Sequence, residues 1–263
     1  MKKPNIALID GDLWCYDIPF ACESGDTPNF DYCITAGEQR MAHILEQTGC
    51  SEVEVYLTGS TNFRNDIATI KEYKAGRGKK PNFYQEMREW MEFSFNAQVI
   101  EGMEADDQLA IRQMQEKGNS VIVSRDKDLR MVRGWHYGYA CGKQPEYAMR
   151  FIDKLGYLEY EKTCKGGGLM WFFAQLLMGD KTDNIQGVDG IGAKKAYDAI
   201  SVLHTPQQMF DKCLELYGDL DALLENGNLL WMVLDLHPDG KPVMFSETDF
   251  CKELINAKKS GED

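Results

Sequence analysis

The sequence contains no apolar run long enough to span a membrane, and no internal repeat or low-complexity segment. Two lysines stand near its start, but the apolar stretch after them is broken at Asp10, so we expect neither a signal peptide nor a membrane span. Hydrophobic residues make up 43% and charged residues 27% of the 263 positions, which indicates a soluble globular protein. This length allows one large domain or two small ones.

Cysteine patterns that bind metal are also absent. The eight cysteines are scattered, none forms a CxxC pair, and none has a histidine nearby at zinc-finger spacing. The pattern argues against a zinc finger and favours reduced thiols in a cytoplasmic protein.

An excess of basic residues is missing too, because the formal net charge is −13. This counts against nucleic acid as a partner, unless many acids share a site with divalent cations and the chain also carries a local basic strip. The late part of segment 58–80 is such a strip, with Tyr73 among its cations and Glu72 as its one acid. Lysine and arginine contact phosphates, whereas the alternative interpretation is a solvated loop. The basic strip consists of Lys71, Lys74, Arg77, Lys79 and Lys80.

Acidic residues follow several predicted strands. The short apolar strand 6–9 ends at Asp10, and the clearest strand, 120–124, is followed by Asp126. Parallel α/β sheets present active-site groups at these carboxyl ends. For Asp10 the alternative is a cap on the following helix, and acids that begin a helix are also favoured by its dipole.

A bound cation explains the number of acids better than helix preference does. Two carboxylates ~4 Å apart repel each other by about 4 kcal/mol at an effective dielectric constant near 20. We therefore predict that four acidic groups converge in a pocket that divalent cations make tolerable. The groups are Asp10 with Asp12, Glu104 with Asp106 and Asp107, Asp126 with Asp128, and Asp180 with Asp183.

A glycine hairpin follows the last acidic group. Gly187, Gly190 and Gly192 allow tight backbone angles, and a helix begins directly after them. The N–H groups of a helix N-terminus can bind an anion, and Lys194 and Lys195 lie in the first turn, where the dipole does not favour cations. The pattern predicts a helix–hairpin–helix clamp for the DNA phosphate backbone, and the alternative is an ordinary glycine turn.

Secondary structure is expected to change along the chain from alternating strands and helices to mostly helix. We place a domain boundary near the glycine run 165–168, so that the predicted domains are 1–168 and 169–263. The expected strands are 6–9, 53–57, 97–101, 120–124, 135–140 and 146–152, and the expected helices are 38–48, 83–95, one beginning at 104, 169–178, 193–201, 206–217, 220–224, 228–236 and 246–257.

Six motifs together resemble the 5′-nucleases of the flap endonuclease superfamily, closest to the phage 5′→3′ exonucleases and the bacterial polymerase-associated 5′-nuclease domain. The resemblance implies a PIN-like α/β core with a mostly parallel sheet, a helical arch or loop, and a C-terminal helix–three-turn–helix region. It covers almost the whole chain. The motifs are LIDGD (8–12), FR…YKAGR (63–77), EADD (104–107), VSRDKDL (123–129), GDKTDNI (179–185) and GVDGIGAKKA (187–196).

The resemblance also implies roles for single residues. Asp10, Glu104 and Asp106 match a first metal site with Asp107 nearby, and Asp126, Asp128, Asp180 and Asp183 match a second site, directly or through water. Lys74 and Arg77 match arch residues that contact the scissile phosphate, and the hairpin 187–192 matches a duplex-binding element that can hold K⁺. One departure stands out, because the family's aspartate after the second strand is replaced here by Gly59 or Leu57. Asp12 could replace it in part, although alternation points its side chain away from Asp10.

These features predict Mg²⁺-dependent hydrolysis of DNA phosphodiesters with two ions, for which Mn²⁺ can substitute. Lys74, Arg77, Asp106 and Asp126 are the expected catalytic residues. The substrates would be 5′ ends, flaps, and nicked or duplex DNA, with RNA primers in hybrids as a further candidate. We expect a monomer with a role in DNA replication, located in the host cytoplasm if a phage encodes it. The alternatives are a PIN-type ribonuclease and a DNA-binding protein with a weakened nuclease site.

Overall fold

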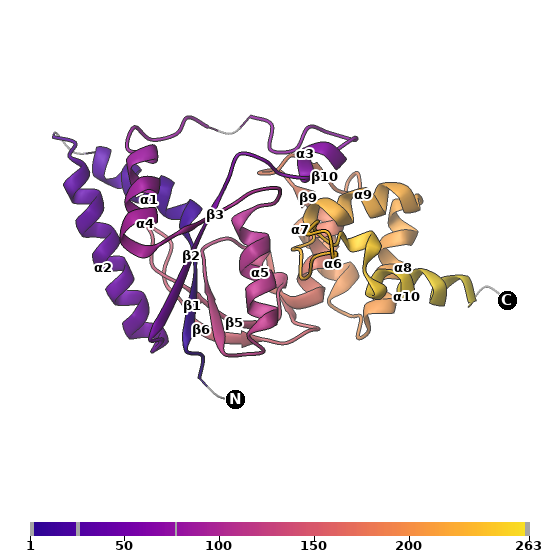
Figure 1. Cartoon of the computed structure of the whole chain (residues 1–263). Helices are drawn as coiled ribbons and strands as arrows, with labels where there is room; N and C mark the ends of the chain where they lie inside the picture. The colour runs from indigo at the N-terminus through magenta and orange to yellow at the C-terminus, as the bar shows by residue number, and fades with distance from the viewer. Residues whose placement is uncertain (1–2, 25–26, 77, 261–263) are drawn as a thin grey trace. The chain divides into compact units, whose positions relative to one another are not determined.

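The computed structural model describes residues 3–24, 27–76 and 78–260 (Figure 1). These residues form two compact units, which we call the sheet unit and the helical unit. The described residues of 1–62, 78–129 and 134–151 belong to the sheet unit, and those of 63–77, 130–133 and 152–263 belong to the helical unit. The two units do not coincide with the predicted domains, which stay a prediction.

Among the described residues, six strands form the main sheet in the order β3-β2-β1-β4-β5-β6. The central strand β1 pairs in parallel with β2 on one side and with β4 on the other, and β3 and β5 continue the parallel pairing. This confirms the predicted α/β class with a mostly parallel sheet. The strands are β1 (Ile6–Asp10), β2 (Glu52–Thr58), β3 (Gln98–Ile100), β4 (Ser120–Val123), β5 (Gly134–Gly138) and β6 (Tyr147–Ile152).

The strand order places a switch point beside β1. From β1 the chain passes to β2 and β3 on one side, and it then returns to β4 on the other side. In open parallel sheets, the connections diverge at such a point and leave a crevice at the carboxyl ends of the strands. Asp10 at the end of β1 and Ser124 after β4 lie at this edge.

Helices cover both faces of the sheet. The helices α1 (Gly11–Glu23), α2 (Phe30–Thr48) and α4 (Tyr84–Phe95) pack on one another and share a core with Ala7 and Ile9 of β1. The helix α5 (Ala105–Gln115) packs against β1, β2 and β4 on the other face, so that the strands lie between α2 and α5 (Figure 1).

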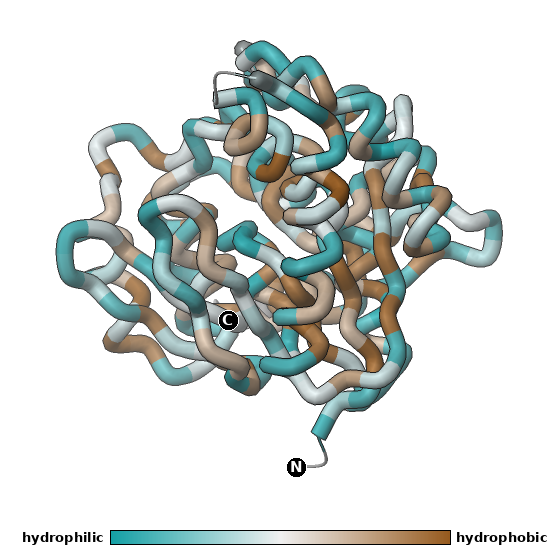
Figure 2. The backbone as a smooth tube through the Cα atoms, turned by 90° about the vertical axis from the view of Figure 1, so that its left-hand side faces the viewer, coloured by the Kyte–Doolittle hydropathy of each residue, from teal (hydrophilic) through white to brown (hydrophobic). Residues whose placement is uncertain are grey.

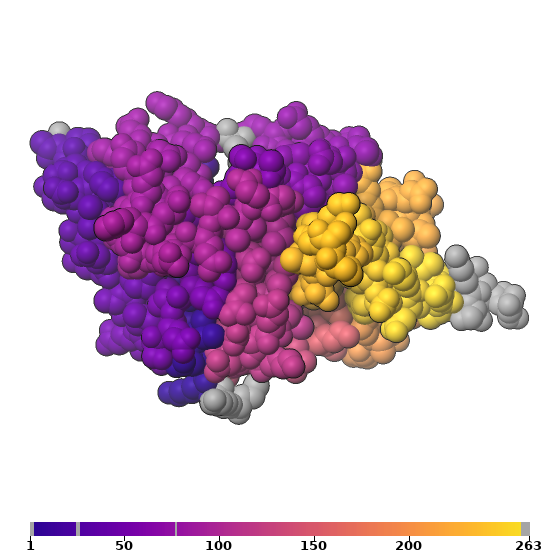
Figure 3. All heavy atoms as spheres, in the orientation of Figure 1, coloured from indigo at the N-terminus to yellow at the C-terminus, as the bar shows by residue number. Residues whose placement is uncertain are grey.

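Hydropathy follows this arrangement. Long hydrophobic stretches of the chain run through the interior, and many outer loops are hydrophilic (Figure 2). The outward side of α5 is in view in the space-filling picture (Figure 3), and Met114 and Gln115 near its end are exposed.

The helical unit is built around α6, whose side chains are almost all buried. The helices α7, α8 and α9 and the antiparallel β7–β8 hairpin pack against it, and a second small hairpin, β9–β10, follows it. No helix of the described part of the chain is both long enough and apolar enough to cross a membrane. The elements of this unit are α3 (Arg64–Ile67), β7 (Tyr157–Tyr160), β8 (Cys164–Gly167), α6 (Gly168–Met178), β9 (Gly179–Asp180), β10 (Ile185–Gln186), α7 (Ala193–Ile200), α8 (Pro206–Tyr217), α9 (Leu220–Leu230), η2 (Phe245–Glu247) and α10 (Asp249–Ser260). The short helix η1 (Asp128–Met131) begins in the sheet unit and ends in the helical unit.

Several predicted element bounds are wrong. The glycine run does not break the chain, because it forms β8 and the start of α6, where a Cβ on Gly168 would lie 2.6 Å from the backbone of Gly156. The predicted helices 220–224 and 228–236 are one helix, α9, which ends at Leu230. Gly227 makes this packing possible, since a Cβ there would lie 2.6 Å from the ring of Phe245.

Other helix starts differ by several residues. The helix predicted to begin at 38 begins at Phe30, because Asn29 accepts the backbone N–H of Asp31 at 3.0 Å and caps it there. The last helix begins at Asp249 rather than at 246, after the short helix η2.

Candidate active site

Asp10 ends β1 at the carboxyl edge of the sheet and is almost completely buried, with 2% of its surface exposed. Its Oδ2 accepts a hydrogen bond from Ser124 Oγ at 2.6 Å, and its Oδ1 accepts the backbone N–H of Leu13 at 3.4 Å. The second contact caps α1, as the alternative interpretation expected. The first contact ties Asp10 to the residue that follows β4.

Ser124 connects Asp10 to the acids after β4. Its Oγ accepts the backbone N–H of Asp126 at 2.9 Å, and Asp126 Oδ1 in turn accepts the backbone N–H of Asp128 at 2.8 Å. Because β1 and β4 are parallel neighbours, their following residues emerge at the same edge. The structure thus brings together Asp10 and Asp126, as predicted. Ser124 stands in the VSRDKDL motif, but the sequence does not indicate that it links Asp10 to Asp126.

The electrostatics of Asp10 reflect this crowding. The pKa of Asp10 is raised to about 7, mainly by burial and also by the negative charges of Asp12 and Asp126, while the hydrogen bond from Ser124 acts in the opposite direction. A carboxylate in this position is therefore costly in its ionised form, and a bound cation would remove that cost.

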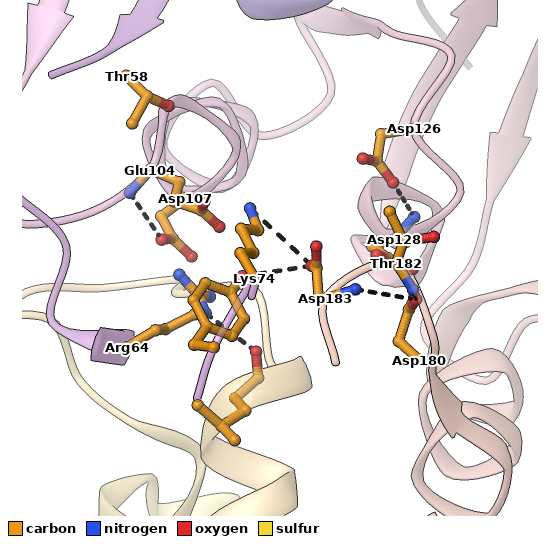
Figure 4. A network of polar contacts seen from close by, with 12 residues as sticks. Thr58, Arg64, Lys74, Glu104, Asp107, Asp126, Asp128, Asp180, Thr182 and Asp183 are labelled. Atoms are coloured by element: carbon orange, nitrogen blue, oxygen red, sulfur yellow. Dashed lines mark hydrogen bonds and ion pairs between the residues drawn. The ribbon is translucent and has the colours of Figure 1, made fainter. Parts of the chain in front are cut away.

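The acids of the EADD motif stand at the start of α5. Glu104 is the N-cap residue and is 8% exposed, whereas Asp107 is fully buried and accepts the backbone N–H of Glu104 at 3.2 Å (Figure 4). This is a capping box, so helix capping accounts for part of the acidity of the motif. Asp106 lies in the first turn of α5 and is half-buried.

Asp12 is committed to the end of β2. Both of its carboxylate oxygens lie 3.1 Å from the backbone N–H of Thr58, which donates to them, and Arg88 Nη1 lies 3.4 Å from Oδ1. Arg88 also donates to the carbonyl oxygen of Thr58 at 2.9 Å. Asp12 therefore braces the strand end beside Gly59.

In the helical unit, Asp180 ends β9 and is 5% exposed. Its Oδ1 accepts the backbone N–H groups of Thr182 at 2.7 Å and of Asp183 at 3.4 Å (Figure 4). These contacts fold the segment between β9 and β10 into a turn that carries Asp183 close to Asp180. The two aspartates of the GDKTDNI motif are thus neighbours within this unit.

Lys74 contacts the same turn. Its backbone N–H donates to the carbonyl oxygen of Asp183 at 2.9 Å, and its Nζ lies 3.9 Å from Asp183 Oδ2 (Figure 4). Tyr73 Oη donates to Asp183 Oδ2 at 3.3 Å. The predicted phosphate-contacting lysine is therefore held by an aspartate that was predicted to serve a metal site.

The segment that carries Lys74 is also anchored upstream. The guanidinium of Arg64 is fully buried and donates to the carbonyl oxygens of Leu229 at 2.9 Å and of Trp231 at 2.7 Å. Glu225 on α9 accepts the backbone N–H groups of Thr69 and Ile70, both at 2.7 Å. The sequence does not predict that Arg64 contacts the end of α9 or that Glu225 contacts the loop at Thr69. Each contact joins residues that are 155 or more positions apart, and residue spacing gives no sign of such contacts.

The predicted glycine hairpin opens α7, with Gly192 as its N-cap residue. Gly190 has a left-handed φ of +73°, as a tight turn requires, and a Cβ on Gly190 or Gly192 would meet no heavy atom within 4 Å. Gly187 differs, because its Cβ would lie 2.3 Å from the backbone of Met178. Packing within the unit thus explains Gly187, but it does not explain Gly192.

The two lysines after the hairpin have different surroundings. Lys195 Nζ donates to the carbonyl oxygen of Gly190 at 2.9 Å and so closes the turn. Lys194 Nζ lies 2.5 Å from Asp198 Oδ1 and within 6 Å of the ring centres of Tyr160 and Tyr197. Both lysines are exposed.

The basic strip is divided between the units. Lys71 and Lys74 belong to the helical unit, and Lys79 and Lys80 belong to the sheet unit, where Lys80 Nζ lies 4.0 Å from the centre of the Tyr84 ring. Arg77, predicted to contact the scissile phosphate, lies outside the described residues.

The donor set of the candidate site consists of carboxylates, and hard cations such as Mg²⁺ prefer oxygen ligands. The buried Asp10 and the half-buried Asp126 repel each other, and they fit a cation at the carboxyl edge of the sheet. In the part of the chain that the structure describes, no three His, Cys, Asp or Glu side chains are grouped as a metal site. The complete ligand set therefore stays a prediction.

Comparison with curated proteins finds several relatives, although no family model matches the sequence. The 5′-3′ exonuclease of Buchnera aphidicola subsp. Schizaphis graminum is 30% identical over 211 residues, which cover 74% of this chain and 69% of that protein. DNA polymerase I of Bacillus caldotenax is 29% identical over 238 residues, which cover 83% of this chain and 26% of the polymerase. The chain thus spans about a quarter of that polymerase's length.

Two solved structures from bacteriophage T5 share the fold. A T5 protein co-crystallized with metal ions matches with a TM-score of 0.62 at 17% identity, covering 96% of this chain and 92% of that one. The T5 flap endonuclease in a complex with DNA and metal ions matches with a TM-score of 0.53 at 16% identity, covering 97% and 99%. These likenesses establish the architecture, and the Buchnera relative establishes the kinship: the chain belongs to the 5′-3′ exonuclease, or 5′-nuclease, family.

Proposed function

We propose that this chain is a metal-dependent 5′→3′ exonuclease and structure-specific 5′-flap endonuclease that hydrolyses DNA phosphodiesters. The observation that carries the proposal is the position of Asp10, which is buried at the switch point of a parallel sheet and linked through Ser124 to Asp126. The Buchnera relative is a 5′-3′ exonuclease, and the polymerase relative matches over a part of its length.

The carboxylates would hold divalent cations, with Mg²⁺ as the physiological ion and Mn²⁺ as a substitute. In the sheet unit, Asp10, Glu104 and Asp106 are the proposed ligands of one ion, with Asp107 fixing Glu104, while Asp126 and Asp128 are proposed ligands of a second. Asp180 and Asp183 are the acids that the helical unit would offer. When bound, two such ions lower the pKa of an attacking water and stabilise the attacking and leaving oxygens.

Lys74 would stabilise negative charge on the scissile phosphate. Its ammonium lies close to the Asp183 carboxylate without a short hydrogen bond to it, at 3.9 Å, and its side chain is 16% exposed. A cation that is held in place before the substrate arrives costs little reorganisation when charge develops on the phosphate. Arg77 is proposed for the same task on the basis of its motif.

The hairpin 187–192 and the start of α7 would bind the duplex backbone. Open space at Gly190 and Gly192 permits close approach of a phosphate to the helix N-terminus, and Lys194 and Lys195 are exposed there. Main-chain oxygens of the same hairpin are the proposed site for K⁺. Lys71, Lys79 and Lys80 would add phosphate contacts that carry no sequence information.

A digest of end-labelled DNA tests the proposal. The wild-type chain is incubated with 5′-flap, nicked and blunt duplex DNA and with single-stranded RNA, with Mg²⁺ or with EDTA, and the products are separated on a gel. We expect Mg²⁺-dependent products from the 5′ ends of the DNA substrates. Asp106→Ala and Asp126→Ala should lose cleavage, and Glu92→Gln, an exposed acid on α4, is the matched control.

Three outcomes would contradict the proposal. Full Mg²⁺-dependent cleavage by both alanine variants would show that these acids are not the catalytic ones. Cleavage of RNA in preference to flap DNA would favour a PIN-type ribonuclease. Tight binding of flap DNA without cleavage in Mg²⁺ or Mn²⁺ would favour a DNA-binding protein with a weakened site.

A further inference from the structure

The turn that follows β2 is fastened to the residues that precede α5. We call residues 59–61 the β2 exit turn. The backbone N–H of Gly59 donates to the carbonyl oxygen of Ile100 at 2.7 Å, and the backbone N–H of Gly102 donates to Thr61 Oγ1 at 2.8 Å. These two bonds run in opposite directions between the segments, with one residue, Glu101, enclosed between them.

The carboxylate of Glu101 holds the whole exit turn. Its oxygens accept the backbone N–H of Ser60 at 3.0 and 3.1 Å and the backbone N–H of Thr61 at 3.1 Å. The hydroxyls of both residues donate to it as well, Ser60 Oγ at 3.2 Å and Thr61 Oγ1 at 2.6 Å. These bonds hold the pKa of Glu101 below its ordinary value, with the Thr61 hydroxyl as the largest cause.

Gly59 is the residue that lets Glu101 reach this position. A Cβ on Gly59 would lie 2.4 Å from both Cδ and Oε1 of Glu101 and 2.7 Å from the carbonyl oxygen of Ile100. Contacts under 3.0 Å are not tolerated, so a side chain at position 59 and a carboxylate at this place exclude each other. Gly59 and Glu101 are thus a matched pair, although 42 positions separate them in the sequence.

The exit turn is joined to α5 at a second point. Thr58, just before the turn, accepts the first backbone N–H of α5, that of Ala105, on its Oγ1 at 2.9 Å. Its own backbone is held by Asp12 and Arg88. Gly102, just after Glu101, has a left-handed φ of +82°, so the chain turns sharply there before Glu104 begins the helix.

From this arrangement we propose that Glu101 is a positioning residue for the acids of α5. Its carboxylate fixes the β2 exit turn against residues 100–102 and thereby sets the direction in which Glu104 and Asp106 leave the sheet edge. The proposal rests on the proposed function, in which these two acids hold a divalent cation. Groups that orient metal ligands change metal affinity or activity by about 10- to 100-fold when removed.

Glu101 is not itself proposed as a ligand. Both of its oxygens accept hydrogen bonds from the exit turn, and one of them, Oε2, accepts four. A cation at this carboxylate would have to displace those donors. The geometry therefore assigns to Glu101 the task of holding backbone, with metal binding left to the residues it orients.

The test measures metal binding apart from catalysis. The affinity of the full chain for Mn²⁺ is titrated without DNA, by the loss of the free-Mn²⁺ spin-resonance signal, for wild type, Glu101→Ala and Glu101→Gln. We expect about 10-fold weaker Mn²⁺ binding in Glu101→Ala and a smaller loss in Glu101→Gln, which keeps an acceptor oxygen. On 5′-flap DNA, kcat should fall while KM stays within about twofold of wild type, because the hairpin and the lysines are untouched. Glu92→Ala is the matched control.

A double-mutant cycle tests the pairing of Gly59 with Glu101. Gly59→Ala alone should weaken Mn²⁺ binding to the extent that Glu101→Ala does, because the new Cβ expels the carboxylate. In the double variant, Gly59→Ala should add less loss than it causes alone, since the clash with the carboxylate is gone and only the contact with the carbonyl oxygen of Ile100 remains. Fully additive losses would show that the two residues act separately and would overturn the pairing.

Other outcomes also decide the matter. If Glu101→Ala has a lower melting temperature but wild-type Mn²⁺ affinity and kcat, Glu101 is only structural and the inference is wrong. If Glu101→Ala does not fold, Glu101→Gln must still show weaker Mn²⁺ binding, and wild-type affinity there would overturn the inference. If the wild type binds Mn²⁺ but does not cleave DNA, the proposed nuclease activity fails while the titration still decides the role of Glu101. A wild type that binds no Mn²⁺ overturns both.

Discussion

Lys74 and Asp183 contact each other through both backbone and side chain. The Lys74 N–H donates to the Asp183 carbonyl oxygen at 2.9 Å, and the Lys74 Nζ lies 3.9 Å from the Asp183 carboxylate. Each of the two contacting segments has a residue other than glycine in the left-handed region. These residues are Lys74, with a φ of +55°, and Asn184, which follows Asp183 and has a φ of +59°. Asn184 Nδ2 also donates to the carbonyl oxygen of Glu72 at 2.8 Å. Conformations of this kind cost energy and are kept where the surroundings determine them.

This geometry separates the backbone role of Lys74 from the role of its ammonium. In Lys74→Gly the N–H to Asp183 remains and the left-handed strain is relieved, so the melting temperature should not fall by more than a few degrees. The ammonium is lost, and we expect kcat on 5′-flap DNA to fall by about 100-fold. The check is a single-turnover rate on labelled flap DNA together with a thermal melt.

Comparing Lys74→Gly with Lys74→Ala separates the effect of backbone strain from the effect of the lost charge. Alanine removes the same charge but keeps the left-handed φ that strains the wild type, so it should lose the same activity and melt at a lower temperature than Lys74→Gly. Lys212→Ala on α8, where a surface lysine pairs with Glu215, is the control for the loss of one positive charge. A Lys74→Gly variant with wild-type kcat would exclude the ammonium from catalysis.

Asp10 should couple the stability of the sheet unit to divalent cations. Without a cation, burial and the charges of Asp12 and Asp126 make its carboxylate unfavourable. Asp10→Asn keeps an acceptor for Ser124 and removes the charge, so in EDTA the variant should melt at a higher temperature than the wild type. Added Mg²⁺ should raise the melting temperature of the wild type and leave the variant nearly unchanged. An equal Mg²⁺ response of both proteins would exclude Asp10 as a ligand.

Arg64 should be a stability residue rather than a phosphate contact, although it stands in the FR motif. Its guanidinium is fully buried and satisfies the carbonyl oxygens of Leu229 and Trp231, where α9 ends. Arg64→Met leaves both acceptors buried, and we expect the free energy of unfolding to fall by about 2–4 kcal/mol. Urea unfolding measures this, with Arg133→Met, an exposed arginine, as control. A loss below about 0.5 kcal/mol would contradict the anchoring role.

The contact between Glu54 and Arg112 should make the stability of the fold depend on pH. Arg112 on α5 donates to Glu54 twice, Nε at 2.8 Å and Nη2 at 2.6 Å, and these hydrogen bonds are the main reason that the pKa of Glu54 lies below its ordinary 4.5. Because the folded value is the lower one, the pair stabilises the fold fully above pH 4.5, and this contribution is lost as the pH falls through the folded value.

Glu54→Gln should therefore lower the free energy of unfolding by about 1 kcal/mol near neutral pH. The difference from wild type should shrink below about pH 4 and vanish once the wild-type carboxyl is protonated. Urea unfolding at both pH values measures it, with Glu86→Gln, an exposed acid on α4, as control. A difference that grows as the pH falls would show that the sign is wrong.

The sequence predicts those parts of the fold that depend on local pattern. The strands around Asp10 and Ser124 are short apolar runs with acids after them, and a parallel sheet brings such strand ends together whatever the intervening loops do. The hairpin before α7 is predictable for the same reason, since the left-handed φ of Gly190 depends only on its own backbone geometry. In each of these features, a few neighbouring residues determine the structure, either through an apolar run or through a turn.

The remaining features depend on contacts between distant segments. Nothing near Glu101 in the sequence shows that its carboxylate occupies the space beside Gly59, and nothing near Glu225 shows that it holds Thr69. The departure at position 59 is visible as a missing acid, but its structural counterpart appears only when β2 and β3 are paired. The break predicted within α9 has the same cause, because nothing near Gly227 in the sequence shows that the ring of Phe245 packs against it.

Gly192 offers a test that separates folding from DNA binding. It is the N-cap residue of α7 with an ordinary negative φ of −97°, and a Cβ there would meet no atom of the protein within 4 Å. Serine is a better N-cap residue than most, so Gly192→Ser should fold with an unchanged or slightly raised melting temperature. The added side chain would nevertheless stand where we propose that a DNA phosphate approaches the helix N-terminus.

We therefore expect Gly192→Ser to bind duplex DNA about 10-fold more weakly than wild type, measured by fluorescence anisotropy in Ca²⁺ at low and at moderate salt. The slope of log affinity against log salt should become shallower, because a backbone contact is lost. The control is Ala21→Ser, which adds a hydroxyl at an exposed position on α1, outside both the hairpin and the basic strip. If the hairpin is only a turn before a helix, the melting temperature and the affinity of Gly192→Ser will both match the wild type, and the duplex clamp must then be sought elsewhere on the helical unit.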